Sequence, residues 1–291
     1  MTNRRKFLAQ AGVISAGIMM KPHMLIAKPR NNVVGLQLYS LRDQLPKDVS
    51  GVIAKVAAAG YKEVETYGYS KNNGFWGLDA KAFGTLLKNN GLTAPSGHFD
   101  MNLFFGSGKT DDLQTYIDAA HEIGMQYIVV PSINGEFIKT VDEFKGVADK
   151  LNKAGEICKK AGLKFGYHNH NFEWKPVDGT TFYDTVINAT DPSLVHFEMD
   201  LYWVVRSEQD PAAIIKAHPG RFSMFHIKDM DKTNPKLNTE IGKGSIDFKS
   251  IMAHAKQAGV KHFIVEQENY INIDPYVSIA ESAAYVKSIL V

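Results

Sequence analysis

Gly162-Leu163-Lys164-Phe165-Gly166-Tyr167-His168-Asn169-His170 is the stretch that decides the fold. It begins with glycine, the residue that best tolerates the left-handed conformation just past the end of a helix. Apolar residues then fall at every second position, the period of a β-strand whose two faces meet different surroundings. The apolar face predicts packing against helices, whereas the opposite face carries Gly166, His168 and His170.

The same unit recurs along the chain. Apolar residues at helical spacing are followed by a glycine and then by a short β-rich run, at Gly60, Gly91, Gly124, Gly162 and Gly259. Strands that alternate with helices indicate a parallel sheet with crossover helices. Eight strands are predicted: Val33–Leu38, Glu63–Thr66, Thr93–His98, Tyr127–Pro131, Lys164–Asn169, Val195–Asp200, Phe222–Ile227 and Phe263–Glu266. The sequence therefore predicts an α/β fold, with a single (β/α)8 TIM barrel over residues 28–291.

The first 27 residues have the pattern of an export signal. Asn3-Arg4-Arg5-Lys6-Phe7-Leu8 resembles the twin-arginine motif, and the apolar run Ala9–Met20 follows it. That run is shorter than the roughly 20 residues of a spanning helix. We predict a twin-arginine-type signal over residues 1–27 and a protein that is periplasmic or tethered to the membrane facing the periplasm. No other membrane-spanning segment is expected.

Composition and charge narrow the function classes. The 291 residues are 44% hydrophobic and 22% charged and include one cysteine, which is typical of a globular chain without internal disulfides. Without residues 1–27, 29 basic residues face 31 acidic ones, a net charge of −2. A mildly acidic chain without a basic run is poorly suited to nucleic acids or anionic membranes.

Four consecutive predicted strands point ionisable groups to the barrel axis. They lie near the carboxyl ends of the strands, where barrel enzymes keep their sites, at His168 and His170, at His196, Glu198 and Asp200, at His226 and Lys228, and at Glu266 and Glu268. Inward charges are costly unless they are paired or bind a metal. Histidine and carboxylate together favour a divalent-metal site. The alternative is a hydrogen-bonded polar plug that closes the barrel.

These residues resemble the xylose-isomerase-like barrels of the sugar phosphate isomerase/epimerase superfamily. The resemblance covers roughly residues 33–291, through Val34–Ser40, Val64-Glu65, Glu198–Leu201, His226–Asp229, Ile241–Phe248 and Val265-Glu266. It implies one divalent ion, manganese, cobalt or zinc, of which we favour manganese. By the same resemblance Asp200, His226 and Glu266 match three of the four metal ligands.

The fifth strand departs from the family pattern. Most members have glutamate where this chain has His168, which we expect to replace it as a ligand. His170 is the alternative ligand, and Glu173 is a further candidate for the site if the chain folds back after the strand. The histidine-rich fifth strand and His226-Ile227-Lys228-Asp229 look like inosose dehydratases, members that remove a proton beside a ketone and expel a β-leaving group.

Other residues are candidates for the substrate wall. Many relatives have histidine three residues after the metal-binding aspartate, where this chain has Trp203, which could stack on a pyranose ring or pack in the core. Gln37, Tyr39 and His98 end the first and third strands, where each could read a sugar hydroxyl or make a structural hydrogen bond. We also expect Glu173 and Lys228 to contact substrate.

The predicted chemistry is removal of a proton next to the carbonyl of a sugar through a metal-stabilised enediolate. Glu266 or His170 is the expected base, and Lys228 is expected to stabilise the developing oxyanion. Reprotonation gives isomerisation or epimerisation, our first reading. Loss of a β-leaving group gives a 3-keto-glycoside lyase or an inosose-type dehydratase.

Two classes of function compete with this reading. A non-catalytic exported sugar-binding barrel is one of them. The other, the apurinic-endonuclease branch, needs histidines that this chain lacks at Trp203 and in Asp229–Lys232. The expected partner is a small, unphosphorylated sugar or glycoside, and a homo-oligomer stays open.

Overall fold

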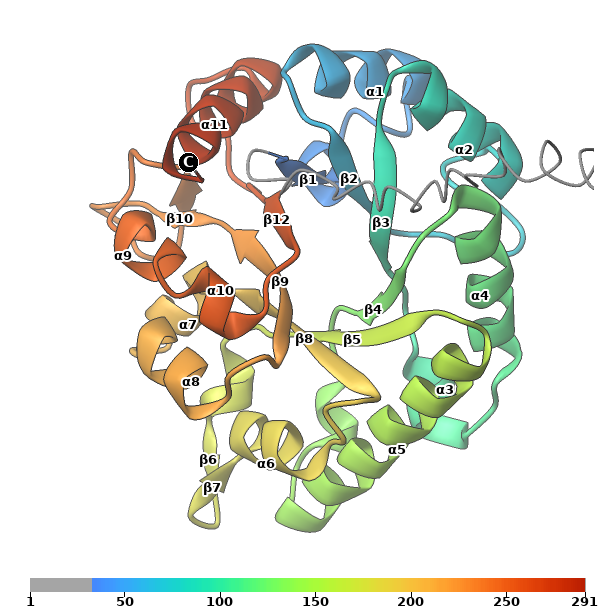
Figure 1. Cartoon of the computed structure of the whole chain (residues 1–291), viewed down its shortest axis with the longest axis vertical. Coiled ribbons are helices and arrows are strands. Elements are labelled where there is room, and N and C mark those ends of the chain that lie inside the picture. The colour runs from blue at the N-terminus through green and yellow to red at the C-terminus, as the bar shows by residue number, and fades with distance from the viewer. Residues whose placement is uncertain (1–32, 291) are drawn as a thin grey trace, which may run out of the picture. The chain divides into compact units, whose positions relative to one another are not determined.

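The computed structural model describes residues 33–290, and within them eight parallel strands close into a barrel in the order β1-β12-β9-β8-β5-β4-β3-β2 (Figure 1). The strands are β1 (Gly35–Gln37), β2 (Glu63–Thr66), β3 (Thr93–His98), β4 (Tyr127–Val130), β5 (Lys164–His168), β8 (Val195–Asp200), β9 (Phe222–Ile227) and β12 (His262–Val265). The predicted (β/α)8 barrel is confirmed, with strand ends within two residues of those expected. The export signal predicted over residues 1–27 lies outside the described residues.

Helices surround the barrel, and most of them bury one apolar face against it (Figure 1). They are α1 (Val49–Ala58), α2 (Ala80–Asn89), α3 (Asn102–Ser107), α4 (Asp111–Ile123), α5 (Val141–Lys160), α6 (Phe182–Ala189), α7 (Leu201–Arg206), α8 (Pro211–Ala217), α9 (Phe248–Met252), α10 (Ala255–Ala258) and α11 (Pro275–Ile289). Two short ribbons, β6 (Pro176–Val177) with β7 (Thr180–Thr181) and β10 (Asp229–Met230) with β11 (Asn238–Thr239), extend from the barrel. Between residues 33 and 290, no helix combines the length and apolarity needed to cross a bilayer.

Side-chain caps and glycines set where the helices begin and end. Thr140 and Glu143 form a capping box at the start of α5, which satisfies backbone N–H groups that the first turn leaves without partners. The five glycines predicted to end helices all have positive φ. Gly124 and Gly259 are the left-handed caps of α4 and α10. The glycine pattern thus predicted the boundaries correctly because a side chain is strained in that conformation.

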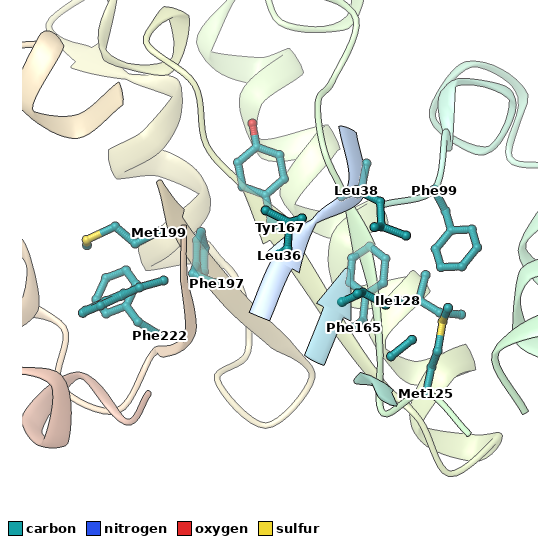
Figure 2. Packing of buried hydrophobic residues seen from close by; sticks show 14 of the residues in the cluster. Leu36, Leu38, Phe99, Met125, Ile128, Phe165, Tyr167, Phe197, Met199 and Phe222 are labelled. Atoms are coloured by element: carbon teal, nitrogen blue, oxygen red, sulfur yellow. The ribbon is translucent and has the colours of Figure 1, made fainter. Parts of the chain in front are cut away.

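The main core lies between the strands and the helices. Figure 2 shows part of it, with Phe165 and Tyr167 from β5 and Phe197 from β8 among the labelled side chains. These residues are the apolar faces that the sequence predicted to pack against helices, and all three are buried. Because successive residues of a strand point to opposite faces, the alternate residues of the same strands point to the barrel axis.

The barrel interior has three layers. A middle layer is apolar and consists of Tyr127, Val129, Met224 and Ile264. Gly166 makes room there, since a Cβ at this position would lie 3.2 Å from Val129 Cγ2. The layer separates polar groups near the amino ends of the strands from those near the carboxyl ends.

The layer near the amino ends, called here the lower layer, consists of Glu63, His196, Ser223 and His262. Glu63 Oε2 lies 2.8 Å from His262 Nδ1, and Ser223 Oγ lies 2.9 Å from His196 Nδ1. His196 therefore faces the axis as predicted, but at the end of the barrel away from the other inward histidines.

Candidate metal centre

Four side chains meet at the carboxyl ends of β5, β8, β9 and β12. Each of His168, Asp200, His226 and Glu266 offers one ligand atom, and these atoms all lie within 4.8 Å of one another. His168 Nε2 is 3.6 Å from Asp200 Oδ2, and His226 Nδ1 is 3.4 Å from Glu266 Oε2. These four residues, called here the outer set, are the ligands predicted from the sequence and the family resemblance.

The outer set fits a divalent ion. His168 Nε2, Asp200 Oδ2 and His226 Nδ1 are buried and have no hydrogen-bond partner in the described structure, which is costly unless something binds there. Ligands about 2.1 Å from one ion stand roughly 3.0–3.5 Å apart, close to the two separations above. Two imidazoles with two carboxylates suit manganese, cobalt or zinc.

In each histidine of the outer set, the ring nitrogen that is not the candidate ligand atom lies near a hydrogen-bond acceptor. His168 Nδ1 lies 3.3 Å from the carbonyl oxygen of Pro131, and His226 Nε2 lies 2.7 Å from Glu65 Oε2. Metal-binding histidines typically donate the second N–H to a carbonyl or carboxylate, which fixes the tautomer. The arrangement leaves the unpartnered nitrogens of both rings available to an ion.

Hydrogen bonds with Asn169 and Trp203 position Asp200. Asn169 Oδ1 accepts the backbone N–H of Asp200 at 3.1 Å. The Oδ1 atom of Asp200 accepts the backbone N–H of Trp203 at 3.1 Å and so caps α7. Since Oδ1 is held in this way, Oδ2 is left toward the outer set.

A second cluster, called here the inner set, contains Glu65, His98, Glu198 and His226. His98 Nε2 lies 3.0 Å from Glu65 Oε2 and 2.7 Å from Glu198 Oε2. Burial alone would lower the pKa of His98, but the two carboxylates raise it to about 10. Burial would raise the pKa of Glu65, yet His98 and His226 hold it well below its usual range.

Sequence reasoning did not predict this cluster as a unit. Glu65 was noted only within the resemblance and Glu198 only as an inward-facing residue, while His98 was expected to read a sugar hydroxyl or to make a structural hydrogen bond. His98 is engaged with two buried carboxylates, and its contact with substrate stays a prediction. The sequence feature that could have indicated the cluster is the presence of two acids, Glu65 and Glu198, at inward positions of buried strands.

Gln37 makes structural hydrogen bonds, one of the two roles predicted for it, and a contact with substrate stays a prediction. Its side chain is fully buried and donates from Nε2 to Glu65 Oε2 at 2.7 Å. Its Oε1 accepts the backbone N–H of Tyr39 at 3.0 Å. Tyr39 itself is 39% exposed and packs edge-on against Tyr67, so its role toward a substrate stays a prediction.

Lys228 lies beside the outer set and is completely buried. Its Nζ contacts Glu268 and lies 3.3 Å from Glu266 Oε2. Burial would lower the pKa of Lys228, but Glu266 and Asp200 raise it, so the ammonium stays charged. Nζ also lies 5.1 Å from the ring centre of Trp203, which places Trp203 against the candidate site.

His170 lies next to the outer set. Its ring centre is 4.9 Å from that of His168 and 5.5 Å from Trp203. Burial is the main cause that lowers the pKa of His170 to about 3, so the ring is neutral. Its Nδ1 has no hydrogen-bond partner in the part of the chain described.

Glu173 folds back after β5, but behind His170. Its Oε1 accepts the backbone N–H of His170 at 2.9 Å and the hydroxyl of Tyr167 at 2.8 Å. The side chain is fully buried and holds the turn that carries His170, and its contact with substrate stays a prediction. Burial raises the pKa of this carboxyl to about 7.

Known proteins share this fold and parts of this sequence. Inosose dehydratase of Clostridium botulinum is 27% identical over 231 residues, which are 68% of this chain and 74% of that protein. Inosose dehydratase of Clostridium beijerinckii is 32% identical over 126 residues, 39% of this chain and 42% of that protein. The chain matches the inosose dehydratase of Clostridium beijerinckii and those of two strains of Clostridium perfringens over half of their length or less.

Among solved structures, a sugar phosphate isomerase/epimerase from Parabacteroides distasonis superposes with a TM-score of 0.79 and 30% identity, covering 90% of this chain and 96% of that one. The profile of the xylose isomerase-like TIM barrel family matches residues 53–289. By fold and by sequence, the chain belongs to the xylose isomerase-like TIM barrel family.

Proposed function

We propose that this protein is a divalent-metal-dependent lyase that removes the proton next to the carbonyl of a keto-sugar or keto-cyclitol and eliminates a β-leaving group. The observation that carries the proposal is the outer set, in which three of the four residues have a buried ligand atom without a hydrogen-bond partner among the described residues, with His170 and Lys228 beside it. The inosose dehydratases among the relatives favour elimination over the isomerisation that we expected first.

The outer set would hold the ion, and we favour Mn²⁺. When bound, the ion supplies Lewis-acid polarisation of the substrate carbonyl. The ammonium of Lys228 faces this region and stabilises negative charge that develops on the carbonyl oxygen. Its contacts with Glu266 and Glu268 hold it in place.

His170 is the base that we propose. Glu266 is engaged with Lys228 and with the outer set, whereas His170 is neutral and has an unpartnered Nδ1. The imidazole accepts the proton from carbon and then donates it to the departing oxygen as the C–O bond breaks. One C–H and one C–O bond are lost, one C=C bond forms, and the leaving group departs as an alcohol or water.

The test is proton NMR of the metal-loaded protein in D₂O with a 3-keto-glucoside and, in parallel, a keto-inositol. We expect release of the aglycone or of water, with an unsaturated keto product. His170→Gln should abolish this turnover and retain one ion per chain, whereas His168→Gln should lose both. Retained turnover in His170→Gln would move the role of base to Glu266.

An epimerase is the second candidate, and the similarity to the Parabacteroides distasonis isomerase/epimerase favours it. It needs proton delivery to the opposite face of the same carbon. In the NMR experiment it would appear as deuterium next to the ketone while the leaving group is retained. If neither signal appears with either substrate, the result favours a barrel that only binds sugar.

Export stays a proposal, resting on the twin-arginine motif alone. Fractionation of cells that express the full chain should find it in the periplasm or on the periplasmic side of the membrane. Arg4→Lys with Arg5→Lys should hold it in the cytoplasm, and unchanged export of this double variant would contradict the proposal.

A further inference from the structure

The outer and inner sets share His226 but meet different nitrogens of its ring. Nδ1 faces Glu266 in the outer set, whereas Nε2 lies 2.7 Å from Glu65 Oε2 in the inner set. We propose that Glu65 is a positioning residue, which keeps the proton of His226 on Nε2 so that Nδ1 is free for the ion. The inner set is then a hydrogen-bonded support and does not hold a second ion. This inference rests on the proposed metal centre.

Separations within the inner set support this assignment. Two of its contacts are 2.7 Å and a third is 3.0 Å, which are lengths of strong hydrogen bonds. Ligands of one ion would stand roughly 3.0–3.5 Å apart. The outer set has separations of 3.4 and 3.6 Å, close to the spacing around one ion. The inner set has one separation of that kind, 3.3 Å between His226 Nε2 and Glu198 Oε1, but its two shortest contacts are shorter than that spacing.

A single oxygen atom is the centre of the inner set. Glu65 Oε2 receives Gln37 Nε2 at 2.7 Å, His226 Nε2 at 2.7 Å and His98 Nε2 at 3.0 Å. Gln37 can only donate from its nitrogen, and a carboxylate can only accept. The oxygen is therefore surrounded by donors, and the proton of His226 that faces it belongs to Nε2.

An inner ion would compete with the outer one. The Oε1 atoms of Glu65 and Glu198 have no hydrogen-bond partner within residues 33–290, and Glu198 Oε1 lies 3.3 Å from His226 Nε2. An inner ion would need a lone pair on Nε2 of His226, yet a neutral imidazole has only one lone pair on its two nitrogens. An ion in the inner set would therefore require the His226 proton on Nδ1, and Nδ1 could then no longer bind an ion in the outer set.

The test compares Glu65→Gln with Glu65→Met. In Glu65→Gln the amide oxygen can still meet the three donors, whereas Glu65→Met removes the acceptor. We expect Co²⁺ affinity within a few-fold of wild type for Glu65→Gln and about 10- to 100-fold weaker for Glu65→Met, the usual effect of losing a partner behind a metal ligand. Glu63→Met is the matched control, because it removes the other inward carboxylate of β2, which pairs with His262 in the lower layer.

Two measurements separate positioning from general damage. Proton–nitrogen correlation spectra of histidine rings in the Zn²⁺-loaded wild type should show His226 protonated at Nε2 and metal-bound at Nδ1, and metal analysis should give one ion per chain. This result needs no variant to fold. A proton on Nδ1, two ions per chain, or an equal loss of affinity in Glu63→Met would overturn the inference.

Failure of the proposed function gives a different result. If the wild type binds no divalent ion, the metal centre itself is wrong. If it binds one ion in the expected tautomer but converts neither keto substrate, the inference stands and only the reaction is wrong.

Discussion

The two ends of the barrel interior contain the same kinds of residues with opposite outcomes. In the lower layer Glu63 pairs with His262 and His196 with Ser223, and none of these four side chains has a buried polar atom without a partner. At the carboxyl ends His168, Asp200 and His226 each leave such an atom. Buried polar groups in folded proteins are normally satisfied, so the unpartnered atoms, more than the residue types, distinguish the carboxyl end of the barrel from the lower layer.

Removing a ligand should have the largest effect. We expect His168→Gln to weaken Mn²⁺ binding by more than about 100-fold, beyond the loss expected for a supporting residue, and to abolish turnover. Isothermal titration calorimetry measures the affinity. Wild-type affinity in this variant would mean that the two ends of the barrel do not differ as described.

A substitution in the lower layer should lower the free energy of unfolding and leave metal affinity unchanged. His262→Phe removes the hydrogen bond between His262 and Glu63, and a buried group that loses a hydrogen bond costs about 1–3 kcal/mol. Urea unfolding should show that loss, while Mn²⁺ affinity stays within two-fold of wild type, about 0.4 kcal/mol. A ten-fold loss of affinity would contradict the separation of the two ends by the apolar layer.

Glu173 extends the comparison, because it is a buried carboxyl at the carboxyl-end side whose Oε1 accepts two hydrogen bonds while its Oε2 has no hydrogen-bond partner among the described residues. Its pKa is raised from 4.5 to about 7, so the folded state binds the proton more tightly than the unfolded state. Its contribution to stability is complete below pH 4.5 and is lost as the pH rises through 7. Between pH 5 and pH 8 the wild type should lose about 2–3 kcal/mol more than Glu173→Gln. Parallel pH–stability curves in urea would contradict this.

The rim of the barrel should show the smallest effect. Tyr39 is partly exposed, and Tyr39→Phe removes only a hydroxyl that could donate to a sugar. We expect KM to rise about two- to ten-fold, the range for one hydrogen bond, with unchanged kcat and unfolding free energy. Steady-state kinetics with the keto-glucoside checks this, and an unchanged KM would remove Tyr39 from the substrate wall.

The strands could be predicted from the sequence because each has an apolar face at period two and a glycine before it. Phe165 and Tyr167 pack outward and His168 faces inward, as their alternation indicated. The outer set followed from the same alternation together with the family resemblance.

The depth of each inward residue could not be predicted. Glu63 and Glu65 are two positions apart on the same face of β2, yet one pairs in the lower layer and the other supports His226. Alternation gives the face of a residue, whereas its layer depends on the stagger between strands.

The neighbours of Gln37 and Glu173 could not be predicted for a related reason. A polar residue at a strand end can face a substrate or a neighbouring side chain with the same sequence pattern. Only the three-dimensional structure shows the contacts with Glu65 and with the backbone of His170.

The central claim is that a single divalent ion binds in the outer set while the inner set stays hydrogen-bonded. Anomalous diffraction from crystals loaded with Mn²⁺, collected near the manganese absorption edge, tests it most directly. We predict one peak in contact with His168 Nε2, Asp200, His226 Nδ1 and Glu266. A peak between Glu65 and Glu198, or no peak at either set, would contradict the account.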